Sequence, residues 1–294
     1  MPASRRALLI GAVGAGSVTA ASVAAGSSSV RHDVRRLVDP VPEPKTSVPA
    51  GPTGRLVSGS FASPAMGGRE IGWTVAYPPG VSTDAALAVA LVLHGRSNDH
   101  ATAFGSHQLQ HFLAAVVRSG TPAFALASVD GADHDYWHMR ANGDDPQRMI
   151  RTEFVPRLQQ RGLRTARLGL SGWSMGGYGA LLLAERLGSA GCAAVAADSP
   201  ALWLSPGDSA PGAFDDRSDF IANDVFAGRA RLGNIPVRIA IGTSDPFYVA
   251  TRRFVGGLTP RPATDFSRGG HDVAFWRHAA TGQLRFLGNA LARA

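Results

Sequence analysis

Residues 166–180 read Ala-Arg-Leu-Gly-Leu-Ser-Gly-Trp-Ser-Met-Gly-Gly-Tyr-Gly-Ala, and here an apolar run passes through a glycine-rich turn into a helical pattern. Gly172, Ser174 and Gly176 form the pattern Gly-x-Ser-x-Gly, which is typical of a nucleophile elbow. In that motif a sharp turn between a strand and a helix carries a strained serine, and the glycines let neighbouring backbone approach closely. The stretch therefore predicts a buried strand that leads into a helix, with the Ser174 hydroxyl protruding at the turn.

Five continuous apolar runs, separated by helical patterns, extend this picture along the chain. Because the runs do not alternate with polar residues, each predicts a strand covered on both faces, as in a parallel sheet. Two earlier segments do alternate, which is typical of antiparallel edge strands. The runs are 88–93, 123–129, 166–170, 193–197 and 237–241; the helical patterns are 103–118, 146–161, 177–187, 219–230 and 248–258; the edge segments are 56–61 and 70–77.

We therefore expect an α/β fold with a mostly parallel central sheet and helices on both faces, where right-handed crossovers place them. A chain of 294 residues with 45% hydrophobic and 17% charged residues can bury a large core, which excludes wholesale disorder. Since α/β folds use about 200 to 250 residues as one domain, we expect one catalytic domain at 55–294. No apolar run of about 20 residues follows the N-terminal region, which excludes a polytopic membrane protein.

The chain is basic, with 29 Lys and Arg residues against 22 Asp and Glu residues. Every basic residue except Lys45 is an arginine, and the arginines are scattered rather than arranged in a stripe with aromatic residues. This distribution argues against nucleic acid as a partner. The net charge of +7 is compatible with peripheral association with an anionic cell envelope.

The first 26 residues predict an export signal. Arg5 and Arg6 precede a mildly apolar stretch at 7–25 that ends in small residues, and this arrangement resembles a bacterial twin-arginine signal. We expect cleavage of residues 1–26 and a protein that is secreted or held at the cell envelope, with retention as an anchor as the alternative. Residues 27–54 are rich in Ser and then in Pro, which predicts a flexible or extended linker.

A serine hydroxyl needs a base to take its proton, and in this motif the acid and the histidine follow the serine in that order. Only two of the nine histidines, His271 and His278, lie after Ser174. His271 follows two glycines, which allow a loop to bend the imidazole into a cleft, whereas His278 lies in an expected helix that starts at Val273. We expect His271 to be the catalytic base.

Two aspartates compete for the role of the acid that orients His271. Asp245 lies just beyond the predicted strand at 237–241, and Asp198 directly follows the strand before it. Some hydrolases carry the acid one strand earlier, so both positions fit a site at the carboxyl ends of the strands. We favour Asp245 and expect Asp198 to cap a turn.

The loop after the predicted strand at 88–93 reads His-Gly-Arg-Ser-Asn-Asp and supplies the second half of an expected oxyanion hole. Gly95 lets the backbone approach the site, and the Arg96 amide is the expected donor. The first donor is the Met175 amide at the N-terminus of the helix after Ser174. His94 precedes the nucleophile, and we expect it to orient the loop by hydrogen bonding.

Several further residues are candidates for the pocket. Trp173, Tyr136 and Trp137 are expected to bind substrate, and the segment 202–214 forms either a flap or a structural loop. His134 and His138 are spaced like metal ligands, but they lie in a loop after a strand, so we expect no metal site. Cys192, the single cysteine, lies in an apolar run, so we expect an inert core thiol.

The chain from about residue 55 onward resembles the α/β-hydrolase esterase family that includes esterase D, S-formylglutathione hydrolases, feruloyl and acetyl-xylan esterases and cell-envelope mycolyltransferases. The resemblance rests on three segments in order, namely 172–180, 242–247 and 269–272, the last followed by Phe-Trp at 275–276. It implies an α/β-hydrolase fold and acyl transfer through an acyl-serine, with no metal or organic cofactor. S-formylglutathione hydrolases carry a His where this chain has Trp173, and mycolyltransferases commonly use a Glu as the acid.

The sequence thus predicts an exported serine esterase that hydrolyses small-molecule, glycan or lipid esters of carboxylic acids through a Ser-His-Asp triad. Two alternatives stay open. One is an envelope acyltransferase of the mycolyltransferase type, which the export signal and the family suggest. The other is a catalytically silent hydrolase fold that binds cell-wall material.

Overall fold

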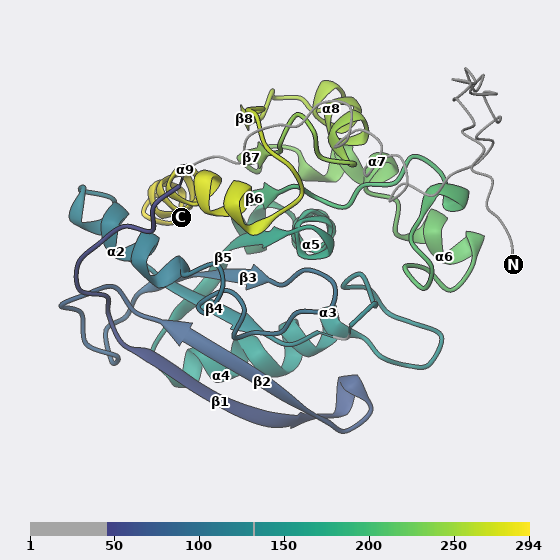
Figure 1. Cartoon of the computed structure of the whole chain (residues 1–294). Helices are drawn as coiled ribbons and strands as arrows, with labels where there is room; N and C mark the ends of the chain where they lie inside the picture. Colours follow the sequence, from purple (N-terminus) through teal and green to yellow (C-terminus); the bar gives the residue numbers. More distant parts are fainter. Residues whose placement is uncertain (1–45, 132) are drawn as a thin grey trace, which may run out of the picture.

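A computed structural model describes residues 46–131 and 133–294 (Figure 1). The predicted export signal at 1–26 and the first part of the predicted linker lie outside the described residues. Within the described part, one eight-stranded sheet has the order β1-β2-β4-β3-β5-β6-β7-β8. The strands are β1 Leu56–Ser63, β2 Arg69–Ala76, β3 Ala88–Leu93, β4 Ala125–Val129, β5 Arg164–Trp173, β6 Cys192–Asp198, β7 Val237–Ala240 and β8 Ala263–Asp265.

Strand directions agree with the hydropathy pattern. β1 and β2 pair in antiparallel fashion and β2 joins β4 in the same way, whereas the pairs from β4 through β3, β5, β6 and β7 to β8 are parallel. Every residue of β3, β4 and β6 is buried, while β1 at the edge exposes most of its side chains. The mostly parallel α/β fold predicted from the continuous apolar runs is confirmed.

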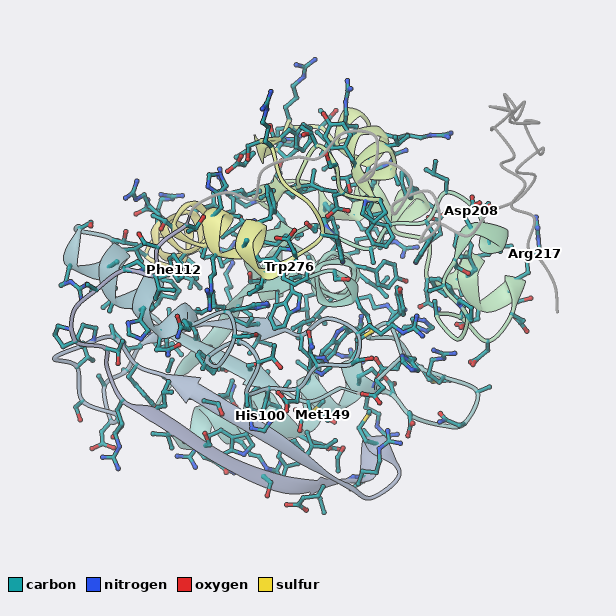
Figure 2. All side chains as sticks on the ribbon, viewed as in Figure 1. His100, Phe112, Met149, Asp208, Arg217 and Trp276 are labelled. Carbon is teal, nitrogen blue, oxygen red and sulfur yellow. The ribbon has the colours of Figure 1, made fainter. Side chains whose placement is uncertain are left out.

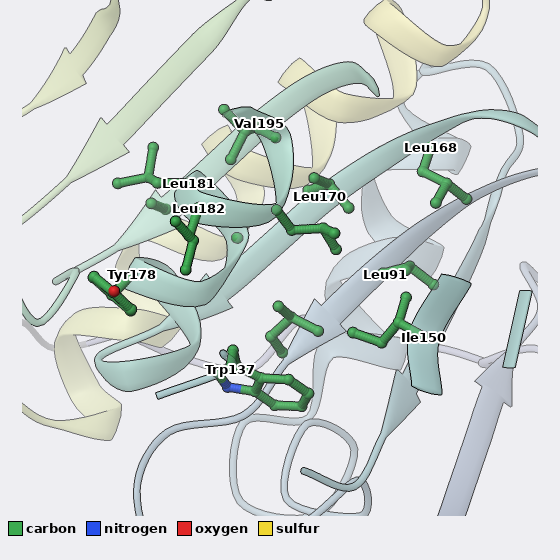
Figure 3. Close-up of a cluster of buried hydrophobic side chains, with 14 of the residues drawn as sticks. Leu91, Trp137, Ile150, Leu168, Leu170, Tyr178, Leu181, Leu182 and Val195 are labelled. Atoms are coloured by element: carbon green, nitrogen blue, oxygen red, sulfur yellow. The ribbon is translucent and has the colours of Figure 1, made fainter. Parts of the chain in front are cut away.

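Helices cover both faces of the sheet. The longer ones are α2 Leu109–Arg118, α5 Met175–Gly191, α8 Tyr248–Gly256 and α9 Val273–Leu291. Side chains of α2 and α9 form one core cluster with one face of the strands, and Phe112 on α2 lies on that side (Figure 2). On the other face, α5 packs on β5 and β6, where Leu181 and Leu182 meet Leu170 and Val195 (Figure 3).

The predicted helix at 146–161 forms in three parts. They are α3 Pro146–Met149, a π-helical segment at Ile150–Phe154 and α4 Val155–Gln160. Pro156 has no N–H to donate and its ring collides with the carbonyl one turn earlier, so a wider π turn accommodates it inside a continuous helix.

Two other helical predictions need correction. The pattern at 103–118 becomes helical only from Leu109, because Gln108 adopts a left-handed backbone with φ of 56°. The pattern at 219–230 is divided into α6 Arg217–Ala222 and α7 Val225–Gly228, since the Asp224 side chain accepts from the Phe226 N–H and starts a new helix. Regular α5 ends as predicted, before Gly188 with its φ of 60°. The short, exposed β8 was not predicted.

The described end of the predicted linker lies along α2. Residues 46–54 form neither helix nor strand, yet Arg118 donates to the carbonyls of Pro52 and Ala50 at 3.0 Å each. Arg118 ends α2 and precedes β4, so these contacts lie at the edge where the parallel strands begin. The chain therefore enters the domain at the amino-terminal edge of the sheet. Across the described ranges, no helix is long and apolar enough to cross a membrane.

A carboxyl group is buried on α5 against α7. The Glu185 side chain occupies the space beside Gly228, where an added Cβ would lie 1.8 Å from Oε2. Burial away from water disfavours the charged form and raises the pKa of Glu185 to about 8. The folded protein thus holds a proton on Glu185 at neutral pH, whereas the unfolded chain, with its ordinary pKa of 4.5, releases it.

This shift predicts that the stability contributed by Glu185 falls as the pH rises. Between pH values near 4.5 and 8 the folded state binds more protons than the unfolded state, so rising pH favours unfolding. We expect Glu185→Gln, which mimics the protonated carboxyl, to raise Tm by several degrees at about pH 8.5 and to change it little at about pH 5. Thermal unfolding followed by circular dichroism measures this effect, and a Tm difference independent of pH would contradict it.

Candidate active site

Ser174 lies at the sharp turn between β5 and α5. Its φ of 55° and ψ of −121° are a strained combination for a residue with a side chain. The turn closes tightly: a Cβ at Gly172 would lie 2.3 Å from the Gly176 carbonyl oxygen, and one at Gly176 would lie 2.0 Å from the Leu93 oxygen. Both flanking positions therefore require glycine, and the turn presents Ser174 at the carboxyl end of β5.

A continuous chain of hydrogen bonds connects the three residues predicted to form the triad. The Ser174 Oγ lies 2.9 Å from His271 Nε2, and His271 Nδ1 lies 2.8 Å from Asp245 Oδ2. The second carboxylate oxygen of Asp245 accepts from the Phe247 N–H at 2.9 Å. Asp245 is 1% exposed, so water does not compete for its oxygens. The arrangement lets the hydroxyl donate toward His271 and the imidazole donate toward Asp245.

Two glycine-rich loops hold His271 above the serine. The Ser244 N–H donates to the Gly269 carbonyl at 3.0 Å, and a Cβ at Gly242 would lie 2.2 Å from that same oxygen. Directly after His271, the Asp272 side chain caps α9 by accepting from the Phe275 N–H at 3.0 Å. The loop of Asp245 and the loop of His271 are thereby joined, which sets the distance between their side chains.

Asp198, the alternative acid, lies at a different place. Its backbone carbonyl accepts from the Ser174 N–H at 3.0 Å, but its side chain bonds to Gln283 on α9. Burial raises the pKa of Asp198 to about 7. His278 lies on α9 as predicted, where its Nε2 is 3.3 Å from the Ser267 hydroxyl. The structure thus brings Asp245 and His271 to Ser174, and keeps Asp198 and His278 in other contacts.

The loop that carries Arg96 lies against the start of α5. A Cβ at Gly176 would be 2.6 Å from the His94 carbonyl, and one at Gly95 would be 2.7 Å from Trp173 Nε1. The Met175 and Arg96 amides therefore belong to adjoining backbone segments at the same edge of the sheet. A side chain at Gly95 would collide with Trp173 and would push the loop away from Ser174.

His94 orients this loop, as predicted. Its Nδ1–H donates to the Gly95 carbonyl at 2.8 Å, and its Nε2 accepts from the Gly131 N–H at 2.9 Å. Trp137 Nε1 donates to the His94 carbonyl at 3.1 Å. Burial lowers the pKa of His94, so the ring stays neutral and keeps one nitrogen as an acceptor.

The three aromatic residues predicted to bind substrate are all buried. Trp173 is 3% exposed and donates to the Asn98 side chain at 3.1 Å. Trp137 is fully buried beside Gly179, and Tyr136 packs edge-on against Tyr178. Their large apolar surfaces pack inside the domain, and their role in binding substrate stays a prediction.

Other aromatic residues surround His271 and were not identified from the sequence. The rings of Phe247 and Trp276 each lie 5.2 Å from the His271 ring, and Trp203 meets Phe247 at 4.9 Å. Figure 2 shows Trp276 at the first turn of α9. Phe247 lies two residues after Asp245, and Trp276 lies five residues after His271. This short separation in sequence was the signal that could have identified both rings as neighbours of the site. Trp203 belongs to the segment 202–214, weighed as a flap.

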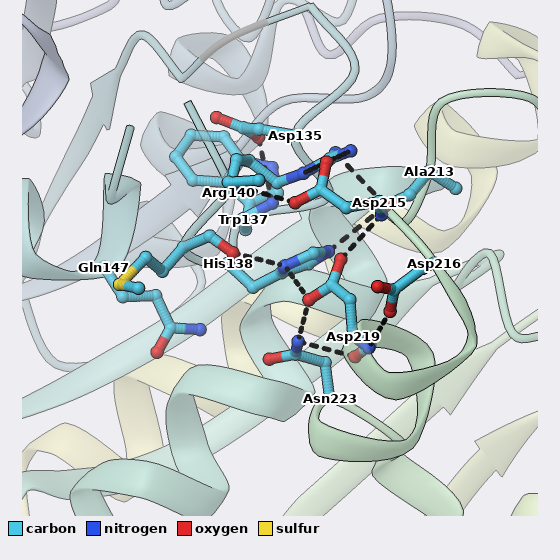
Figure 4. Close-up of polar contacts among 12 residues, drawn as sticks. Asp135, Trp137, His138, Arg140, Gln147, Ala213, Asp215, Asp216, Asp219 and Asn223 are labelled. Atoms are coloured by element: carbon cyan, nitrogen blue, oxygen red, sulfur yellow. Dashed lines mark hydrogen bonds and ion pairs between the residues drawn. The ribbon is translucent and has the colours of Figure 1, made fainter. Parts of the chain in front are cut away.

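A polar network fastens that segment to the loop after β4 (Figure 4). Arg140 donates to Asp215 at 2.7 Å and to the Gly212 carbonyl at 2.9 Å. His138 Nε2 donates to the Ala213 carbonyl at 3.1 Å, while His134 instead accepts from Arg96. His134 and His138 thus have separate partners, and the described residues contain no group of three or more potential ligands for a metal ion.

Cys192 opens β6 and is fully buried. Burial raises the pKa of its thiol to about 12, so at neutral pH the thiol is uncharged and unreactive. The prediction of an inert core thiol is confirmed.

Comparison with known proteins places this site in a family. The model of the family described as "Putative esterase" matches residues 63–287. A search of the curated proteins found no match.

Solved structures share the fold at low sequence identity. A ferulic acid esterase from Anaeromyces mucronatus in complex with ferulic acid is 16% identical, with a TM-score of 0.68 over 84% of this chain and 96% of that chain. An S-formylglutathione hydrolase from Agrobacterium tumefaciens is 15% identical, with a TM-score of 0.67 over 83% and 98%. A fluorophosphonate-binding serine hydrolase from Staphylococcus aureus is 20% identical, with a TM-score of 0.64 over 81% and 100%.

The family match spans most of the described domain and contains every residue of the hydrogen-bonded chain at Ser174. The neighbours share the overall fold of this chain, with TM-scores of 0.64 to 0.68. The chain therefore belongs to this esterase family.

Proposed function

We propose that this protein hydrolyses carboxylic esters with Ser174 as nucleophile, His271 as general base and Asp245 as the acid that orients the base. The observation that carries the proposal is the unbroken chain from Ser174 Oγ through His271 to Asp245, with distances of 2.9 and 2.8 Å. These distances fall within the reach that proton transfer needs.

The geometry suggests each step of the reaction. Ser174 Oγ attacks the ester carbonyl while its proton passes to His271 Nε2, and the buried Asp245 carboxylate stabilises the imidazolium through Nδ1–H. The Met175 and Arg96 amides donate to the developing oxyanion, and the N-terminus of α5 favours its negative charge. The imidazolium returns the proton to the departing alcohol, and water then hydrolyses the acyl-serine by the reverse route.

The surroundings of His271 favour small esters with an apolar or aromatic part. Phe247 and Trp276 bracket the imidazole, and the A. mucronatus structure holds ferulic acid. A series of 4-nitrophenyl esters of increasing chain length measures the preferred acyl group. Adding glycerol or trehalose to the same assay tests the transferase alternative, for which an acylated acceptor would be the product.

A covalent probe tests the assignment of the nucleophile. We expect a fluorophosphonate to label the purified protein at Ser174, because the probe reacts only with an activated serine, and the S. aureus neighbour is described as binding such probes. Mass spectrometry of the labelled peptide identifies the site, with Ser60→Ala on the exposed part of β1 as the control that keeps the label. Labelling at another serine would refute the assignment, and no labelling would favour a silent fold.

We also propose that residues 1–26 direct export by the twin-arginine route and that the enzyme acts outside the cytoplasm, in solution or at the anionic envelope. The Arg5-Arg6 pair before the apolar stretch supports this. A reporter fused after residue 54 should reach the periplasm or medium, and replacing both arginines with lysine should block it. Export unaffected by that replacement would contradict the twin-arginine assignment.

A further inference from the structure

The Arg96 side chain contacts the loop after β4. Its Nε donates to His134 Nδ1 at 2.8 Å, so that ring nitrogen is the acceptor. Among the described residues no Asp or Glu forms an ion pair with Arg96, whereas Arg140 pairs with Asp215 at 2.7 Å and Arg69 with Asp144 at 2.8 Å. Arg96 is therefore an unpaired cation at an exposed position.

The backbone of this residue lies close to the turn that carries Ser174. Arg96 directly follows Gly95, which contacts Trp173 next to Ser174. Its charge also acts on Tyr136, whose pKa is raised by burial and partly lowered again by Arg96. The guanidinium therefore lies near enough to Tyr136 for its charge to act on the Tyr136 hydroxyl.

The position of the guanidinium is fixed by contacts to the neighbouring loop. The His134 carbonyl accepts from Arg140 Nη1 at 3.0 Å, and the Ser97 N–H donates to the Asp133 carbonyl at 3.4 Å. These bonds join the two loops and so position His134. His134 in turn accepts a hydrogen bond from the Nε of Arg96. Within the described part of the chain neither Nη nitrogen of Arg96 has a hydrogen-bond partner, which leaves the two-pronged side of the guanidinium available.

We infer that Arg96 binds an anionic group of the ester substrate, a carboxylate in the simplest case, and makes the enzyme selective for esters that carry one near the reacting carbonyl. A guanidinium binds a carboxylate through two parallel hydrogen bonds, and its charge is not weakened here by an acidic partner. This inference rests on the proposed esterase activity and adds the class of substrate to it. The carboxylate can belong to the acyl part or to the alcohol part.

Two matched substrate pairs distinguish these sources. For the acyl side, 4-nitrophenyl monoadipate is compared with its methyl ester; for the alcohol side, 4-acetoxybenzoate is compared with methyl 4-acetoxybenzoate. The measured quantity is the ratio of kcat/KM for the charged ester to that for the neutral one. We expect Arg96→Gln to lower this ratio about tenfold or more for at least one pair, and added salt to lower it in the wild type but not in the variant.

Arg293→Gln is the matched control, because it removes the same charge beyond the far end of the 19-residue helix α9. Its ratios should equal those of the wild type, and Arg96→Lys, which keeps the charge without the planar fork, should fall between. Equal ratios for wild type and Arg96→Gln in both pairs would overturn the inference while the neutral esters are still hydrolysed. If the wild type hydrolyses no ester, the proposed function fails, and this inference with it.

Discussion

Ser174→Ala should lower kcat for a 4-nitrophenyl ester by at least about 10³-fold. In the proposed mechanism the reaction needs an oxygen nucleophile at the turn after β5. In the described residues, the only group that the structure shows within hydrogen-bond distance of His271 Nε2 is the Ser174 hydroxyl. Steady-state kinetics measure the loss. The residual rate reports what the oxyanion donors and substrate binding supply without the nucleophile.

Two controls separate this loss from damage to the fold. Alanine keeps the Cβ that the strained turn already accommodates, so Tm and circular dichroism should match those of the wild type. Ser60→Ala, on the exposed β1, should keep full activity. A Ser174→Ala protein that retains more than about a tenth of the wild-type rate would show that another group performs the attack.

Asp245→Asn should lower kcat by about 10⁴-fold with little change in KM. The buried carboxylate accepts from His271 Nδ1 at 2.8 Å and so keeps the other ring nitrogen free to take the serine proton. An amide can donate to Nδ1 instead, which places the ring proton on Nε2, where it faces Ser174 and blocks the transfer. The loss of the negative charge also destabilises the imidazolium.

Asp198→Asn is the matched control for this change. It replaces the competing aspartate at the next strand end with the same isostere, and burial already raises the pKa of Asp198 to about 7, so an uncharged group fits there. We expect kcat to stay within about threefold of the wild type. A large loss for Asp198→Asn together with a small one for Asp245→Asn would reverse the assignment of the acid.

The choice between these aspartates shows the limit of prediction from sequence. Both follow strands, so both lie at the carboxyl edge, and chain order alone admits either. The decision depends on which way each side chain points: Asp198 ends β6 and reaches Gln283 on α9, while Asp245 lies in a turn beyond β7 that faces His271. That direction is a property of the packed sheet and has no local signature.

The turn at Ser174 and the strands were predictable because their signals are local. Gly172, Ser174 and Gly176 encode a turn by backbone geometry, and a continuous apolar run encodes a strand covered on both faces. The aromatic wall of Phe247 and Trp276 depends instead on segments separated in the chain coming together around His271. For the same reason Trp173 and Trp137, adjacent to functional loops in sequence, are buried.

The hydrogen bonds from Arg118 to the carbonyls of Ala50 and Pro52 determine how the enzyme is oriented when its amino-terminal side is attached to a surface or a carrier. That attachment point lies at the edge where the parallel strands start, and Ser174 lies at the edge where they finish. If the protein were coupled to a resin, a sensor chip or a fused carrier through its amino-terminal side, the edge of the sheet that carries Ser174 would therefore face away from the attachment point and toward the substrate in solution.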